Sequence, residues 1–161
     1  MKTAPARGSH LPVLMKLLPM TQGPVFELGC GMYSTPYLHW YCFAQNRRLV
    51  TYENNPKYME FANQFAKGLH EVVFVEDWHK LDLSAPCSIA FVDHAPDRER
   101  YLEMERLTHA EYVVAHDAEN ANRRKYHYDR VFPLYKYRDK YSAAFPYTLI
   151  LSNTHDVRGL I

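Results

Sequence analysis

Short apolar runs alternate with longer amphipathic stretches along most of this 161-residue chain. The runs at about 24–28, 48–53, 71–76, 88–93 and 111–116 are almost continuously hydrophobic, which is typical of strands buried between two layers of helices. The intervening segments at about 35–46, 57–67 and 97–108 have the pattern of helices. This alternation predicts a series of βαβ units and a doubly wound parallel sheet.

The pattern changes after residue 125, where the sequence becomes aromatic-rich and strand-like at Tyr135–Tyr141 and Pro146–Asn153. Two such runs joined by a short loop predict an antiparallel hairpin. We therefore expect one α/β domain over residues 24–161, with a mostly parallel seven-stranded sheet that ends in this hairpin. A short N-terminal segment, 1–23, precedes the domain, and its Leu11–Met15 run is a candidate lid over a cleft.

Composition narrows the class of protein. Hydrophobic residues make up 47% and charged residues 23%, as in a soluble globular domain, and a net charge of +1 argues against bulk attraction to nucleic acids or acidic membranes. The three cysteines lack metal-type spacing, so we expect reduced thiols and a cytoplasmic protein. The apolar run Leu11–Met20 is interrupted by Lys16 and is too short for a membrane span, so no membrane partner is expected.

The segment Val25–Pro36 is the strongest motif, because a buried strand runs into a glycine turn and then a helix start. Gly29 and Gly31 allow turn conformations and a close approach of a ligand, and Ser34 is a suitable N-cap. Glu27, just before the first glycine, would repel the pyrophosphate of a dinucleotide. S-adenosylmethionine, which carries an ammonium and a sulfonium group, suits this charge better.

A second acid, Glu53, ends the next predicted strand 22 residues beyond Gly31. An acid at about this distance accepts hydrogen bonds from ribose hydroxyls. With these motifs, residues 24–153 resemble the class I S-adenosylmethionine-dependent methyltransferases, whose domain is Rossmann-like. The resemblance implies that S-adenosylmethionine is the cofactor, held by Glu27, Gly29, Cys30, Gly31, Tyr33, Ser34, Glu53 and Asn54.

The third strand ends at Glu76-Asp77-Trp78. In the family, a polar residue here bonds the adenine amine and a neighbouring aromatic ring covers the base, which gives Asp77 and Trp78 cofactor-binding roles. The alternative is a surface acid beside a packed tryptophan. His94, after the fourth strand, is expected to pack against the adenine.

Acids and histidines converge at the fourth and fifth strand ends, Asp93-His94 and His116-Asp117. They resemble the catechol O-methyltransferase branch, in which Asp93, His116 and Asp117 would match the magnesium ligands. Histidine is a poor magnesium ligand, and Pro96 stands where that branch has its catalytic lysine, so no metal is expected. Instead, His116 is predicted to act as a general base oriented by Asp93 or Asp117. The alternative is that His116 and Asp117 cap the following helix.

The fourth strand is not followed by the Asn/Asp-Pro-Pro-Tyr/Phe motif that holds a flipped base, so methylation of DNA is disfavoured. O-methylation of a small molecule or sugar is the favoured function. Methylation of RNA or protein and a non-catalytic binding module stay open, because the basic, tyrosine-rich segment Arg123–Tyr141 suits either an anionic acceptor or a solvated surface. A homodimer is expected, since the methyl-bearing face of so small a domain needs a cover.

Overall fold

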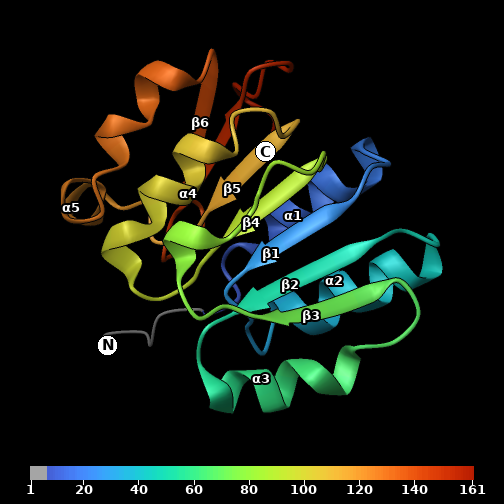
Figure 1. Ribbon diagram of the computed structural model, residues 1–161. Coiled ribbons are helices and arrows are strands. Elements are labelled where there is room, and N and C mark those ends of the chain that lie inside the picture. Colours follow the sequence, from blue (N-terminus) through green and yellow to red (C-terminus); the bar gives the residue numbers. More distant parts are fainter. Residues whose placement is uncertain (1–6) are drawn as a thin grey trace, which may run out of the picture.

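A seven-stranded sheet with the order β3-β2-β1-β4-β5-β7-β6 forms the centre of the computed structural model, which describes residues 7–161 (Figure 1). The strands are β1 (Val25–Leu28), β2 (Leu49–Glu53), β3 (His70–Phe74), β4 (Ile89–Val92), β5 (Tyr112–Ala115), β6 (Tyr137–Tyr141) and β7 (Thr148–Ser152). Strands β1 to β5 are parallel, and β7 runs antiparallel to both β5 and β6. The predicted doubly wound α/β fold with its terminal hairpin is confirmed.

Helices cover both faces of the sheet, with α1 and α2 behind it and α4 in front in the view of Figure 1. The α-helices are α1 (Leu11–Leu17), α2 (Ser34–Ala44), α3 (Pro56–Ala62), α4 (Arg100–Arg106) and α5 (Asn120–Lys125). Short 3-10 helices are η1 (Leu18–Met20), η2 (Asn63–Phe65), η3 (Trp78–Lys80), η4 (Asp97–Glu99), η5 (Tyr128–Arg130) and η6 (Phe132–Leu134). None of the helices within residues 7–161 is long and apolar enough to cross a membrane.

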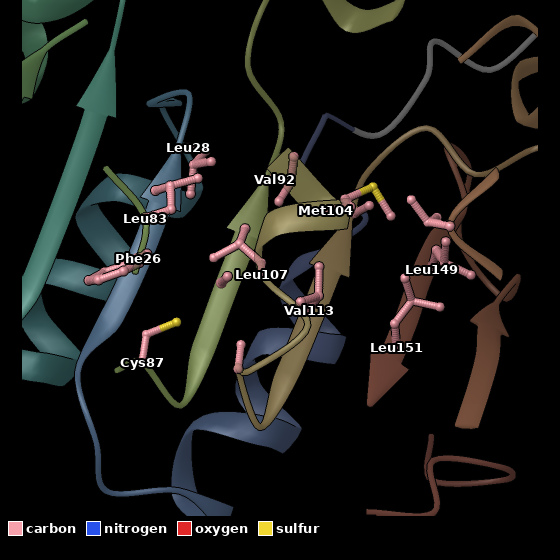
Figure 2. Close-up of a cluster of buried hydrophobic side chains, with 14 of the residues drawn as sticks. Phe26, Leu28, Leu83, Cys87, Val92, Met104, Leu107, Val113, Leu149 and Leu151 are labelled. Carbon is pink, nitrogen blue, oxygen red and sulfur yellow. The ribbon is translucent and has the colours of Figure 1, made fainter. Parts of the chain in front are cut away.

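Each central strand contributes side chains to two separate cores, which explains why these strands are hydrophobic at successive positions. On β1, Val25 faces the core beneath α1 and α2, whereas Phe26 faces the core beneath α4. Figure 2 shows the second core, where Met104 and Leu107 from the α4 region lie over the sheet near Val113. The sheet edge at the carboxyl ends of β1, β2, β4 and β5 is thereby held between two packed layers.

Helix α1 was not predicted, and it changes the interpretation of the N-terminal segment. Pro12 lies in its first turn, where proline is compatible with a helix. Val13, Leu14 and Leu17 have no exposed surface and belong to the core shared with α2. Within the Leu11–Met15 run, Val13 and Leu14 are therefore part of this core, while residues 1–6 of the predicted lid segment lie outside the described residues.

Candidate functional site

A cavity of about 560 Å³ lies at the carboxyl ends of β1, β2, β4 and β5. This is where the strand order reverses, since β1 lies between β2 and β4, and such switch points bind ligands in open α/β sheets. Its volume is within the range of small-molecule sites. Most of the predicted site residues line it, namely Gly29, Cys30, Gly31, Tyr33, Ser34, Glu53, Asn54, Asp93, His94, His116 and Asp117.

Gly29 must be a glycine, because the backbone of the loop after β4 passes very close to it. Its φ is +89°, a conformation that other residues rarely adopt, and a Cβ atom there would lie 2.5 Å from the Cα of His94. The loop after β4 therefore crosses directly over the glycine turn. This contact places the β1 turn and the β4 loop side by side in the cavity wall.

The second half of the turn differs from the prediction. Gly31 does not have a positive φ, and its N–H donates to the hydroxyl of Thr35 at 3.0 Å. Helix α2 begins at Ser34, so Tyr33 is the N-cap residue and makes no capping hydrogen bond through its side chain. The predicted N-cap at Ser34 is thus wrong by one residue, although both Tyr33 and Ser34 line the cavity.

Glu27 lies beneath the turn and does not line the cavity. The hydroxyls of Thr35 and Thr51 donate to its carboxylate at 2.9 and 2.7 Å. Burial raises the pKa of Glu27 to about 7, although hydrogen bonds, including those from the two threonines, act in the opposite direction. Because Thr35 also accepts from Gly31, Glu27 anchors the glycine turn from below.

Glu53 is 4% exposed and ties the end of β2 to the glycine turn. Its carboxylate accepts backbone N–H bonds from Cys30 at 2.8 Å, Asn54 at 2.9 Å and Asn55 at 2.7 Å. A carboxylate has about four lone-pair sites, so these bonds leave capacity for a ligand hydroxyl. Glu53 also lines the cavity, beside the glycine turn.

Asp77 and Trp78 do not line the cavity. Asp77 caps η3 by accepting from the N–H of His79, and Trp78 is buried against His94 with ring centroids 4.1 Å apart. Their positions match the alternative of a surface acid beside a packed tryptophan. His94 lines the cavity, and its Nε2 lies 2.8 Å from the fully buried carboxylate of Glu103, which fixes the ring.

Arg100, from the start of α4, links the acids at the far end of the cavity and was missed in the sequence. Its guanidinium lies 2.9 Å from Asp93 and 3.0 Å from Asp117, and its Nε donates to the backbone oxygen of His94. Burial would lower its pKa, but the charges, chiefly that of Asp93, raise it above the usual range. Arg100 lies in an ordinary helical pattern, so the sequence does not indicate that it binds the two acids.

His116 faces a protein group at each ring nitrogen. Nε2 lies 3.0 Å from the hydroxyl of Ser9, while Nδ1 lies 3.3 Å from Asp93 and 3.8 Å from Asp117. Burial alone would lower its pKa, but the hydrogen bond and charge of Asp93 outweigh burial and raise it. Both ring nitrogens are therefore engaged, and the general base predicted from the sequence would have to release one of these partners before it accepts a proton.

His10 is the second residue that the sequence did not reveal. It lines the cavity, is 3% exposed and packs edge-on against His116. Burial, followed by the charge of His116, lowers its pKa to about 4. It directly precedes α1, so the packing of that helix on the sheet brings it to the site, and the sequence separation of more than 80 residues from Asp93 hides this contact.

The magnesium set implied by the catechol O-methyltransferase branch does not fit. Magnesium prefers oxygen ligands in octahedral geometry, whereas here Arg100 binds both Asp93 and Asp117, and His116 stands between them. The Arg100 guanidinium already binds one oxygen of each carboxylate, and His116 offers nitrogen where magnesium prefers oxygen. We derive no step of the reaction from magnesium.

The sequence matches no protein-family model and no curated protein. Solved structures are similar in fold. A cofactor-bound protein from MTB is 21% identical with a TM-score of 0.62, covering 96% of this chain and 83% of its own. A methyltransferase from Pyrococcus furiosus is 14% identical, with a TM-score of 0.60 and coverage of 90% and 83%. The precorrin-6y C5,15-methyltransferase of Geobacter metallireducens is 14% identical, with a TM-score of 0.62 and coverage of 92% and 93%.

The chain shares the Rossmann-like fold of these solved structures. This fold confirms the architecture expected from the class I resemblance, and the finer resemblance to the catechol O-methyltransferase branch is not confirmed. In this fold the glycine turn after β1 and the acid that ends β2 meet in one cavity with the β4 and β5 ends.

Proposed function

We propose that the chain is an S-adenosylmethionine-dependent methyltransferase. One observation carries the proposal: a single cavity joins the glycine turn and Glu53 at one end to Asp93, His116 and Asp117 at the other. The methyltransferase fold of the similar structures supports it, as does the bound cofactor of the MTB protein.

In this proposal a ribose hydroxyl donates to the remaining lone pair of Glu53, which lines the cavity together with Asn54. The carboxylate of the cofactor lies near the backbone of Gly31 and Tyr33, at the start of α2, where helix N–H groups favour an anion. The methyl group then points to the β4 and β5 ends. Glu27 supports this binding indirectly, by holding the turn.

The acceptor that we favour is an oxygen on a small molecule or a sugar. Asp93, His116 and Asp117 are the proposed catalytic residues, because they offer polar side chains where the acceptor must lie. Their fixed positions on strand ends suit alignment of sulfur, methyl and acceptor, which supplies most of the acceleration in such a transfer. The Arg100 bridge keeps the two carboxylates in place.

Methylation of RNA is the second candidate, favoured by a smaller cavity of about 250 Å³ beside α5 and β6. Arg123, Arg138 and Lys140 line it together with the ring of Phe132, over which both guanidinium groups lie. Positive charge interleaved with an aromatic ring is the chemistry that binds single-stranded RNA. A protein acceptor and a non-catalytic module are the remaining alternatives.

We also propose a homodimer in the cytoplasm. Trp40 and Phe43 are 61% and 63% exposed on α2, and their rings lie 6.0 Å apart, so they form an apolar patch that suits a second copy of the chain. The three free cysteines suit a reducing compartment. Light scattering across a range of concentrations tests the dimer, and a mass of one chain at every concentration contradicts it.

The function is tested by transfer of a radiolabelled methyl group from S-adenosylmethionine to lysate fractions separated by size. We expect label in the small-molecule fraction, and its loss in the Asp93→Asn variant. Asp82→Asn, an exposed acid outside the cavity, is the matched control and keeps the activity. Label in the RNA or protein fraction selects the alternative acceptor, and no label in any fraction contradicts an active enzyme.

A further inference from the structure

His10 is a buried polar side chain without a hydrogen bond. Neither of its ring nitrogens has a partner within residues 7–161, although the side chain is 3% exposed and lines the cavity. Buried polar groups in folded proteins are nearly always paired with protein, water or an ion. The unpaired nitrogens of His10 therefore indicate that a ligand binds in this cavity.

The hydrogen bonds of His116 define where that ligand lies. The Ser9 hydroxyl donates its proton to the backbone oxygen of Pro146 at 2.6 Å, so its oxygen accepts from Nε2–H of His116. With this proton on Nε2, the Nδ1 atom of the neutral ring carries a lone pair. In the absence of a metal, a second proton on Nδ1 bridges His116 to a carboxylate oxygen of Asp93 at 3.3 Å, and a metal ion that displaces this proton gains both atoms as ligands.

Asp93 has one oxygen committed and one available. Arg100 binds Oδ1 at 2.9 Å, and Oδ2 faces His116. The ligand atoms of His10, Asp93 and His116 all lie within 4.8 Å of one another. Ligands on one zinc-type ion lie at most about 4.2 Å apart, since each bond is about 2.1 Å, so a small rotation of a side chain completes the geometry.

We propose that His10, Asp93 and His116 bind one divalent transition-metal ion of the zinc class. Two imidazoles and one carboxylate suit Zn²⁺, Co²⁺ or Ni²⁺ and disfavour Mg²⁺, which prefers oxygen ligands. Ser9 on His116 and Arg100 on Asp93 provide the outer hydrogen bonds that orient metal ligands. The set differs from the magnesium set, because His10 enters it and Asp117 stays with Arg100.

This proposal revises the expectation of a metal-free site. No local pattern in the sequence predicts that residue 10 lies at the β4 and β5 ends, and without it the candidate metal ligands were Asp93, His116 and Asp117. An ion held by three protein ligands keeps open positions toward the cavity, where it polarises a bound oxygen. The metal site stands on its own residues and does not depend on which acceptor is methylated.

The test is metal binding by the purified full chain after removal of metals with a chelator. Calorimetric titration is expected to give one Zn²⁺ per chain with micromolar or tighter affinity, and no binding of Mg²⁺ at the same concentrations. Co²⁺ is expected to give the visible absorption of a site with nitrogen and oxygen ligands. Zn²⁺ should also raise the Tm, because a ligand that binds only the folded state stabilises it.

His10→Ala is expected to weaken Zn²⁺ binding at least tenfold and to remove the rise in Tm. The matched control is His109→Ala, which changes an exposed histidine outside the cavity and should bind as the unchanged chain does. Circular dichroism shows whether each variant is folded, and His10→Gln repeats the test if the alanine variant unfolds. The proposal is overturned if the unchanged chain binds no stoichiometric Zn²⁺, or if folded His10 variants bind it equally well.

Discussion

Glu27 belongs to the glycine-turn motif, although its side chain does not line the cavity. Its charge before the glycine turn gave the first indication of a cationic cofactor, yet the carboxylate is fully buried against two threonine hydroxyls. Sequence spacing identifies that an acid belongs to the turn. It does not determine which face of β1 the side chain takes, because the strand is buried on both faces.

The Glu27 carboxyl is expected to make stability depend on pH. Its pKa is about 7 in the folded chain and 4.5 without the fold, so the folded state holds the proton more tightly. This contribution is present below pH 4.5 and is lost as the pH rises through 7, a change of about 3 kcal/mol. Glu27→Gln should therefore become more stable relative to the unchanged chain over this interval.

Urea unfolding at a series of pH values measures this difference. His70, whose lowered pKa makes stability rise with pH, is present in both proteins, so taking the difference between them reduces its opposite contribution. A constant difference between pH 4.5 and 7 would mean that the carboxyl is not held in the buried network.

At the same scale, Glu53 and Asp93 could be predicted because each ends a buried strand, and strand ends meet at one edge of a parallel sheet. His10 and Arg100 could not. Their positions follow from the packing of α1 and α4, which depends on tertiary contacts that a local pattern does not encode. Asp77 and Trp78 also follow a strand, but β3 is an edge strand and its end lies away from the cavity.

Among the elements, the glycine turn has the strictest requirement. Gly29→Ala places a Cβ atom 2.5 Å from the Cα of His94 at a φ of +89°. Gly68→Ala is the matched control, since Gly68 also has a positive φ, +61°, but nothing within 4 Å. We expect Gly68→Ala to lower the free energy of unfolding by about 1–2 kcal/mol, because of the backbone conformation alone.

Gly29→Ala should lower the free energy of unfolding by about 1–3 kcal/mol more than Gly68→Ala does, because the turn or the loop after β4 must move. Its affinity for the cofactor should fall as well. Chemical unfolding of both variants measures the two costs. Equal costs would show that the close contact between the turn and the β4 loop does not constrain the fold.

Helix α1 supplies a second prediction at this scale. Leu14→Ala should destabilise the chain by about 2–5 kcal/mol, because Leu14 is fully buried beneath the sheet. The adjacent Met15 is 55% exposed, and Met15→Ala should change stability by less than about 0.5 kcal/mol. Thermal unfolding of both variants measures these effects. If α1 were a detachable lid and not part of the core, both substitutions would change stability only slightly.

For the whole molecule, the alternation of strand and helix patterns was enough to predict the sheet, because strands buried between two layers of helices are mostly apolar on both faces. Helix α1 was missed since its seven residues are too few for a periodic pattern to be distinct from a buried strand. The cavity follows from the topology. The residues that line the cavity beside the β4 and β5 ends include His10 and Arg100. Their positions depend on how α1 and α4 pack, and therefore on the complete fold.

Cofactor binding tests the central claim most directly. Calorimetric titration with S-adenosylmethionine and its demethylated product should give roughly micromolar affinity, while NAD should not bind. Glu53→Ala should weaken binding by about 1–3 kcal/mol through loss of charge-assisted hydrogen bonds. Glu71→Ala, an exposed acid on the neighbouring strand β3, should leave it unchanged. Tight binding of NAD with no response to S-adenosylmethionine would contradict the account.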